Sequence, residues 1–238
     1  MKKIAFFVEG PTERIFLKSL LTEVFSQKHL SIAEKSLRGG SSCPLIVSTI
    51  ETITATEEEK FYLLIYDCGN DSKVKSDILE HQSSLISSGY SKIIGIRDLF
   101  PQSKADLAKL KQGLNSNLDQ TRVNISFVVP VMETEAWFIA DLTHFAKINT
   151  SLTTNYILDR TGIDLENINV EDLIHPSETL DSIYRLIGMA YVHGAQRRKS
   201  EVRLRRTCRT LDYAELYLRI KDNVPSLKLL VDEIDSCF

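Results

Sequence analysis

Acidic side chains directly follow four apolar segments in the first 141 residues, and this repetition has a chemical meaning. The acids are Glu9, Asp67, Asp71, Asp98, Glu133 and Glu135. Crowded carboxylates repel one another and cost stability unless a cation lies among them. Oxygen ligands without Cys or His partners suit Mg²⁺ or Mn²⁺. Such a site can polarise a phosphodiester and activate water, and a carboxylate left off the metal can act as general acid or base.

Acids that follow strands also have an ordinary structural role, because they cap helices and form turns. For any one of the six taken alone, that role is the simpler interpretation. Glu9 and Asp67 differ from the others, since each directly follows an unbroken apolar run, at residues 4–8 and 61–66. We therefore take these two as candidate catalytic residues and all six as candidate metal ligands.

Apolar runs of strand length alternate with helical repeats over the first 147 residues. We expect strands at residues 4–8, 30–37, 61–66, 92–96 and 125–131. We expect helices after Pro11 and at residues 44–59, 74–88, 104–114 and 133–145. This alternation predicts an α/β fold with a Rossmann-like, mainly parallel sheet. Ligands of such sheets bind at the carboxyl ends of the strands, where the six acids fall.

The pattern changes after residue 147, where only helical periodicity remains, interrupted by Gly162, Pro176 and Pro225. The sequence therefore predicts a catalytic core over residues 1–147 and a helical region over residues 148–238.

Seven basic residues crowd into thirteen positions of this helical region. They are Arg197, Arg198, Lys199, Arg203, Arg205, Arg206 and Arg209. Basic clusters mark phosphate contacts, so this segment is a candidate nucleic-acid-binding surface. We expect Arg198, Arg205 and Arg209 to share one helix face. Two other interpretations stay open: a solvated face above an apolar stripe, or a surface that docks an acidic partner.

The composition narrows the class of protein. A net charge of −3 excludes a globally basic nucleic-acid coat but not a local basic site. The four cysteines show no C-x-x-C spacing and no His partner at zinc-ligand spacing, so we expect free thiols in a reducing compartment and no zinc. No apolar stretch approaches the roughly 20 residues that span a bilayer, so we expect a cytoplasmic protein without membrane contact.

Three segments resemble a known family. Residues 6–17 resemble the first motif of Toprim domains, with a hydrophobic strand, Glu-Gly, a short polar step, a second Glu and a helix. Residues 63–71 resemble the second motif, a strand ending in Asp-x-Asp, although Gly69 occupies the second Asp position and the next acid is Asp71. Residues 129–141 resemble the strand and Glu-x-Glu-Ala-Trp helix of small stand-alone Toprim-like proteins from bacterial defence neighbourhoods. These are similar to the overcoming-lysogenization-defect (OLD) nucleases.

The resemblance covers about residues 3–141 and implies a Mg²⁺- or Mn²⁺-dependent nuclease that cuts DNA or RNA, tRNA included, in anti-phage defence. It implies that Glu9 is the general acid/base and Asp67 a metal ligand. It also implies a separate ATPase subunit as partner and is compatible with an oligomeric protein. Two alternatives stay open: a Toprim-like module that binds nucleic acid or a partner without cutting, which Gly69 favours, and a small-nucleotide phosphohydrolase.

Two substitutions would test the proposed roles of Glu9 and Asp67. We expect Glu9→Gln and Asp67→Asn each to abolish activity and leave the fold intact. We also expect Asp67→Asn to raise thermal stability in the absence of metal, because one repelling carboxylate is gone.

Overall fold

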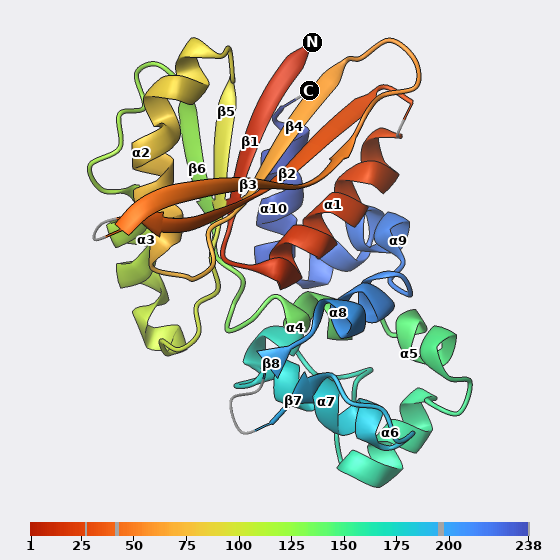
Figure 1. Ribbon diagram of the computed structural model, residues 1–238. Coiled ribbons are helices and arrows are strands. Elements are labelled where there is room, and N and C mark those ends of the chain that lie inside the picture. The colour runs from red at the N-terminus through yellow and green to blue at the C-terminus, as the bar shows by residue number, and fades with distance from the viewer. Residues whose placement is uncertain (27, 41–42, 195–197, 238) are drawn as a thin grey trace.

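The computed structural model describes residues 1–26, 28–40, 43–194 and 198–237. Its centre is a six-stranded sheet in the order β3-β2-β4-β1-β5-β6 (Figure 1). The strands are β1 (Lys2–Val8), β2 (Leu30–Gly40), β3 (Cys43–Ile53), β4 (Phe61–Asp67), β5 (Lys92–Ile96) and β6 (Asn124–Val128). All neighbours pair in parallel except β3, which runs antiparallel to β2. The predicted α/β fold with a mainly parallel sheet is confirmed.

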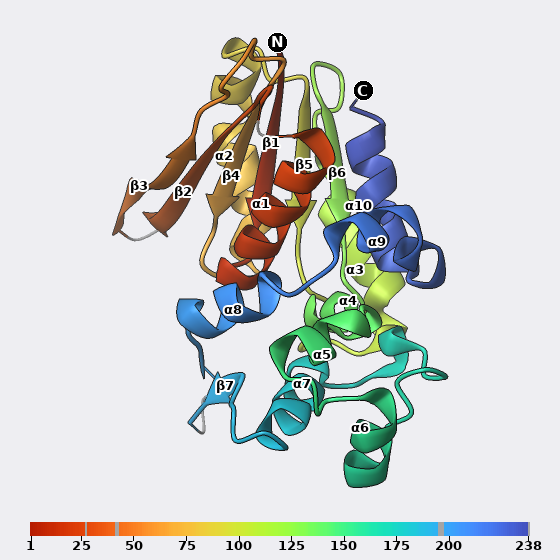
Figure 2. The same cartoon turned by 90° about the vertical axis from the view of Figure 1, so that its right-hand side faces the viewer.

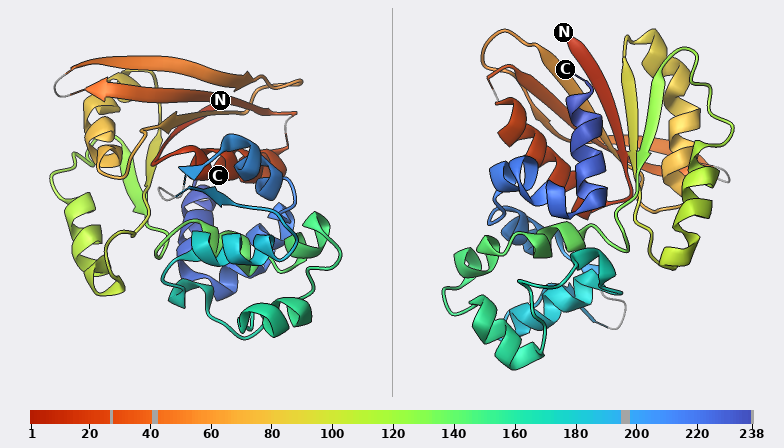
Figure 3. Two further views of the ribbon diagram at one scale, coloured as in Figure 1. Left: turned by 60° about the horizontal axis from the view of Figure 1, so that its bottom comes forward. Right: turned by 180° about the vertical axis from the view of Figure 1, so that it is seen from behind.

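Helices cover both faces of this sheet, which lies between them when seen from behind (Figure 3). One face carries α2 (Lys73–Ser87) and α3 (Leu107–Asn115), which follows the short 3-10 helix η1 (Lys104–Asp106). The other face carries α1 (Pro11–Phe25) together with three helices from the end of the chain (Figure 2). These are α8 (Glu201–Cys208), α9 (Tyr213–Leu218) and α10 (Pro225–Asp235), with η3 (Ile220–Asn223) between the last two.

The remaining elements lie beyond the carboxyl ends of the strands, at the bottom of Figure 1. They are α4 (Glu135–Ala140), α5 (Thr143–Ile148), α6 (Thr154–Thr161), η2 (Val170–Asp172), α7 (Pro176–Arg185), β7 (Val192–His193) and β8 (Arg198–Lys199). The last two form a two-stranded antiparallel pair. The carboxyl edge of the sheet is therefore covered by chain from the second half of the sequence.

Strand β1 shows why its sequence is apolar without interruption. Phe6 and Val8 pack into the hydrophobic cluster beneath α1, while Phe7 packs into the cluster beneath α2. Both phenylalanines are fully buried, and each such burial contributes roughly 1.5–3 kcal/mol. A strand covered on both faces needs apolar side chains at consecutive positions.

Two expected elements differ from the structure. The helix predicted at 44–59 is wrong, because residues 44–53 belong to strand β3, in which Ser48 pairs with Ser36 of β2, and residues 54–59 form neither helix nor strand. Its Ile46, Val47 and Thr49 are β-branched, and β-branched residues favour strands. The helix predicted at 133–145 is two helices that break at Asp141, whose Oδ1 accepts a hydrogen bond from the backbone N of Thr143.

The two halves of the chain share one hydrophobic cluster. Phe16 of α1 contacts the ring of Trp137, and the same cluster contains Leu180 and Leu230. The division expected at residue 147 therefore does not coincide with a break in this core.

Two further expectations concern the thiols and the membrane. Cys68, Cys208 and Cys237 are free thiols, and the side chain of Cys43 lies outside the described part. None of the helices that the structure describes combines the length and the apolar character needed to cross a membrane.

Candidate active site

Five carboxylates gather beyond the carboxyl ends of β1 and β5, and we call them the acidic cluster. They are Glu9, Glu13, Asp98, Glu133 and Glu135. Neighbouring parallel strands bring the first members together, since Val8 pairs with Ile96 in register. The backbone N of Asp98 donates to Oε2 of Glu9 at 3.3 Å.

The starts of two helices hold Glu13 and the side chain of Asp98 in place. Pro11 occupies the first position of α1, where its missing N–H costs nothing. Oε2 of Glu13 accepts a hydrogen bond at 3.0 Å from the backbone N of Gly10, which supplies a partner for a free donor at the helix start. Oδ1 of Asp98 accepts from both the backbone N and Oγ1 of Thr134, each at 3.0 Å, just before α4. The contacts of Asp98 therefore join the end of β5 to the start of α4.

Burial and mutual repulsion keep protons on this cluster. Burial, then the charges of Glu13 and Asp71, raise the pKa of Glu9 to about 8. Burial raises the pKa of Glu13 to about 7, with Lys199 opposing the shift and Glu135 adding to it. The pKa of Asp98 is raised well above its ordinary value by burial, then by Glu13 and Glu9. A cluster with these values favours any cation that can enter it.

Lys199 of β8 supplies a cation from a distant part of the sequence. Its Nζ lies 2.7 Å from Oε1 of Glu135, and the same oxygen accepts from the hydroxyl of Tyr191 at 2.7 Å. Burial alone would lower the pKa of Lys199, but Glu135, Glu133 and Asp98 raise it above its ordinary value. Oε2 of Glu135 is buried and has no hydrogen-bond partner among the residues that the structure describes.

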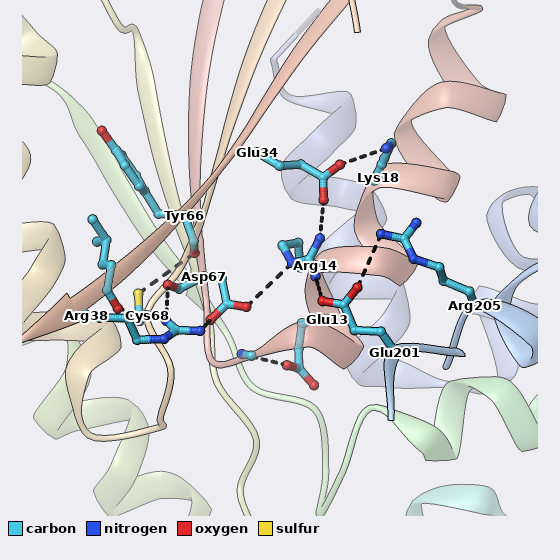
Figure 4. A network of polar contacts seen from close by, with 12 residues as sticks. Glu13, Arg14, Lys18, Glu34, Arg38, Tyr66, Asp67, Cys68, Glu201 and Arg205 are labelled. Carbon is cyan, nitrogen blue, oxygen red and sulfur yellow. Dashed lines mark hydrogen bonds and ion pairs between the residues drawn. The ribbon is translucent and has the colours of Figure 1, made fainter. Parts of the chain in front are cut away.

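Asp67 belongs to a different set of contacts, shown in Figure 4. It pairs in register with Val8, so its side chain faces α1. Its Oδ2 lies 3.5 Å from Nε of Arg14, and its Oδ1 lies 3.0 Å from Nη2 of Arg38. Arg14 also pairs with Glu34 at 2.6 Å and with Glu201 at 2.5 Å. These contacts predict that Asp67→Asn destabilises the protein, the opposite of the effect expected from the sequence, because Arg14 and Arg38 would each lose an anion.

The missing acid at position 69 has a backbone explanation. Gly69 has φ +86°, in the region that side chains rarely adopt, and a Cβ there would lie 2.9 Å from Nη1 of Arg38. Asp71 lies at the rim of the acidic cluster, where it raises the pKa of Glu9 and pairs with Arg97 at 3.0 Å. Asp71 therefore lies beside the acidic cluster, but it does not take the place of the second acid of the Asp-x-Asp motif.

Comparison with known proteins gives a family. Residues 8–199 match the model described as Domain of unknown function (DUF4276). The chain belongs to this family. The matched segment includes every member of the acidic cluster and ends at Lys199. Among curated proteins, none matches the sequence. The crystal structure of hypothetical protein PH0156 from Pyrococcus horikoshii OT3 is similar at 14% identity and a TM-score of 0.49, covering 98% of this chain and 100% of that chain.

Within this DUF4276 chain, the sequence assigned one role, metal ligation, to several members of the acidic cluster, but their contacts in the structure differ. Both carboxylate oxygens of Glu133 accept from Ser177, one from its backbone N at 2.8 Å and one from its Oγ at 2.9 Å, so Glu133 also holds the start of α7. Glu13 and Tyr191 were not selected. Glu13 had a signal, because it is the second Glu of the Toprim-like segment; Tyr191 had none.

The basic segment does not form the helix expected of it. Arg198 and Lys199 belong to β8, and α8 begins only at Glu201, so the shared helix face predicted for Arg198, Arg205 and Arg209 is wrong. Arg197 and the side chain of Arg198 lie outside the described residues.

Several cations of this segment face inward. Arg203 donates to the carbonyl of Val192 at 2.9 Å, and Arg206 donates to the carbonyl of Ala190 at 3.1 Å. These two arginines therefore hold the chain around β7, whereas Arg209 is exposed. Phosphate binding by the segment stays a prediction.

Proposed function

We propose that this protein hydrolyses phosphodiester bonds of DNA or RNA at the acidic cluster, with Mg²⁺ or Mn²⁺. The observation that carries the proposal is the convergence of Glu9, Glu13 and Asp98, with raised pKa values, on the edge where parallel sheets bind ligands. The Toprim resemblance supports the reaction class. It extends the proposal to a cytoplasmic role in anti-phage defence with a separate ATPase subunit.

The donor set suits a hard divalent cation. Its ligands are carboxylate oxygens, and Oε2 of Glu135 is buried without a hydrogen-bond partner in the described part of the chain. Glu9, Asp98 and Glu135 are the side chains that would hold the ion, which supplies Lewis-acid polarisation of a phosphoryl oxygen. In the part of the chain that the structure describes, no three Asp, Glu, His or Cys side chains form a finished ligand group. Ligation therefore requires these carboxylates to turn toward the ion.

The chain's own groups cover the other needs of the reaction. Glu13, whose pKa burial raises to about 7, is not among these ligands and can exchange a proton near neutral pH, as a general acid or base must. Lys199 presents an ammonium group fixed by Glu135, and an ammonium group can neutralise a phosphate. Tyr191 orients the same carboxylate from the other side.

A cleavage assay tests the proposal. The purified protein is incubated with Mn²⁺ and plasmid, single-stranded DNA or tRNA, alongside Glu9→Gln, Asp98→Asn and the exposed control Asp159→Asn. We expect cleavage of at least one substrate, a loss of about 10²-fold or more in the first two variants, and none in the control. A folded Glu9→Gln protein that cleaves at the wild-type rate contradicts the proposal.

A second candidate function is nucleic-acid binding without cleavage. The pairing of Lys199 with Glu135 favours it, because an internal cation already lies in the cluster. The same substrates decide between the two functions when binding is measured beside cleavage. Binding without metal-dependent cleavage of any substrate selects the second.

A further inference from the structure

A pocket of about 360 Å³ opens between the start of α2 and the η1–α3 segment. Three cations line it, Lys75 from α2, Arg97 after β5 and Lys109 from α3, against the single acid Asp106 among the described lining residues. We call it the basic pocket. It is separate from the basic segment around α8, which lies on the other face of the sheet (Figure 2).

The basic pocket keeps a net positive charge, because its three cations face two acids, Asp106 and the Asp71 that pairs with Arg97. Lys75 donates to neutral oxygens, the carbonyls of Gly113 and Ser116 and the hydroxyl of Ser116. Asp106 stays charged, because hydrogen bonds from the backbone N and hydroxyl of Ser103 lower its pKa, and it offsets one of these cations. The pocket therefore attracts an anion rather than a cation.

Arg97 connects the basic pocket with the acidic cluster. Its Nη2 donates to Asp71 at 3.0 Å, and Asp71 is close enough to Glu9 to raise the pKa of that residue. Nε of Arg97 is buried and finds no hydrogen-bond partner within residues 1–26, 28–40, 43–194 and 198–237, so the guanidinium retains an unused donor there. An anion in the pocket and a phosphodiester at the cluster would lie on either side of the Asp71–Arg97 pair.

We infer that the basic pocket binds a backbone phosphate of the nucleic acid, next to the phosphodiester positioned at the acidic cluster. The inference rests on the proposed function for the identity of the substrate. Two ammonium groups and a guanidinium on three different elements suit a phosphate with several exposed oxygens. The strand then crosses the carboxyl edge of the sheet from the cluster toward α2 and α3, away from α8.

Binding of a fluorescein-labelled single-stranded 20-nucleotide DNA, measured by anisotropy in EDTA at several KCl concentrations, tests the inference without cleavage. The variant is Lys75→Gln/Lys109→Gln. We expect roughly tenfold weaker binding and a salt slope lower by about 1.4, since each single-strand phosphate contact contributes about 0.7. The matched control, Lys60→Gln/Lys111→Gln, removes two lysines that do not line the pocket, one of them from α3, and should bind as wild type.

A second variant guards against misfolding, because Lys75 also holds the end of α3. Lys109 forms no hydrogen bond or ion pair with the residues that the structure describes, so Lys109→Gln alone should keep the wild-type melting temperature while lowering the slope by about 0.7. Unchanged binding in both variants overturns the inference. So does the absence of any binding by the wild type, or a slope that falls only in Arg205→Gln/Arg209→Gln.

The proposed function and this inference fail separately. Glu9→Gln should lose cleavage yet keep the wild-type affinity and salt slope. A wild-type protein that binds through Lys75 and Lys109 but never cleaves overturns the proposed function and keeps the pocket. If the protein cleaves in a metal-dependent way but binding does not depend on either lysine, the basic pocket is overturned and the proposed function is kept.

Discussion

Replacing Lys199 with Met should destabilise the protein in EDTA by about 3 kcal/mol. The Nζ–Oε1 distance to Glu135 is 2.7 Å, and the Glu135 side chain is fully buried. At an effective dielectric constant near 20, this separation corresponds to a gross attraction of about 6 kcal/mol. The net loss is smaller, because the variant no longer desolvates an ammonium group and Glu135 can take up a proton. Breaking one side of a buried pair typically costs about 3–5 kcal/mol, and the 22% exposure of Lys199 places this pair at the lower end.

Urea unfolding and thermal melts at pH 7.5 measure this loss. A change of about 3 kcal/mol should lower Tm by roughly 6–12 °C in a chain of this length. The control is Lys228→Met, because Lys228 forms an exposed pair with Asp232 at 2.8 Å, and such pairs contribute about 1 kcal/mol or less. The double variant Lys199→Met/Glu135→Gln should recover most of the loss, since no buried charge remains unpaired. If Lys199→Met is as stable as the control variant, the electrostatic description of the acidic cluster is wrong.

Three further predictions follow from the same contacts. The pKa of Glu9 is raised by burial and by Glu13 to about 8, so the folded protein keeps a proton that the unfolded chain releases above about 4.5. The free energy of unfolding in EDTA should therefore fall as pH rises from 5 to 8, by up to about 1.4 kcal/mol per pH unit for one proton. Glu9→Gln should flatten this slope in urea titrations. Asp67→Asn should lower the free energy of unfolding by about 3 kcal/mol, because Arg14 loses an anion in a buried network, and an unchanged or raised Tm would refute this. Gly69→Asp, which restores the Asp-x-Asp spacing, should cost about 1–3 kcal/mol in thermal melts, because φ is +86° and Arg38 must move; a neutral effect would show that the turn is not strained by a side chain.

The sheet and one pair of its acids could be predicted from local sequence. Unbroken apolar runs such as the one around Phe6 and Phe7 fix strands that are covered on both faces, and parallel order then places the residues after β1 and β5 at one edge. Glu9 and Asp98 come together for that reason alone. Strand β3 was missed because residues 44–59 combine strand-favouring Ile and Thr with acids that also fit a helix end.

The rest of the site depends on contacts between distant segments. Asp67 has the same local signature as Glu9, but Arg14 from α1 and Arg38 from β2 reach it across the sheet. Lys199 enters the acidic cluster from a strand 64 positions beyond its partner Glu135. The density of basic residues indicated a charged surface, and only the fold separates Lys199 and Arg203, which face inward, from exposed Arg209.

Titration of Mn²⁺ into the protein at pH 8, followed by isothermal calorimetry, tests the central claim most directly. At this pH, deprotonation of Glu9 no longer opposes ligation strongly, because its pKa, raised by burial and by Glu13, is about 8. The wild type and the exposed control Asp159→Asn should bind Mn²⁺ with the same affinity, and Glu9→Gln and Asp98→Asn should each bind at least tenfold more weakly. No heat of binding to the wild type, or equal affinity in all four proteins, would contradict a divalent-cation site at the acidic cluster.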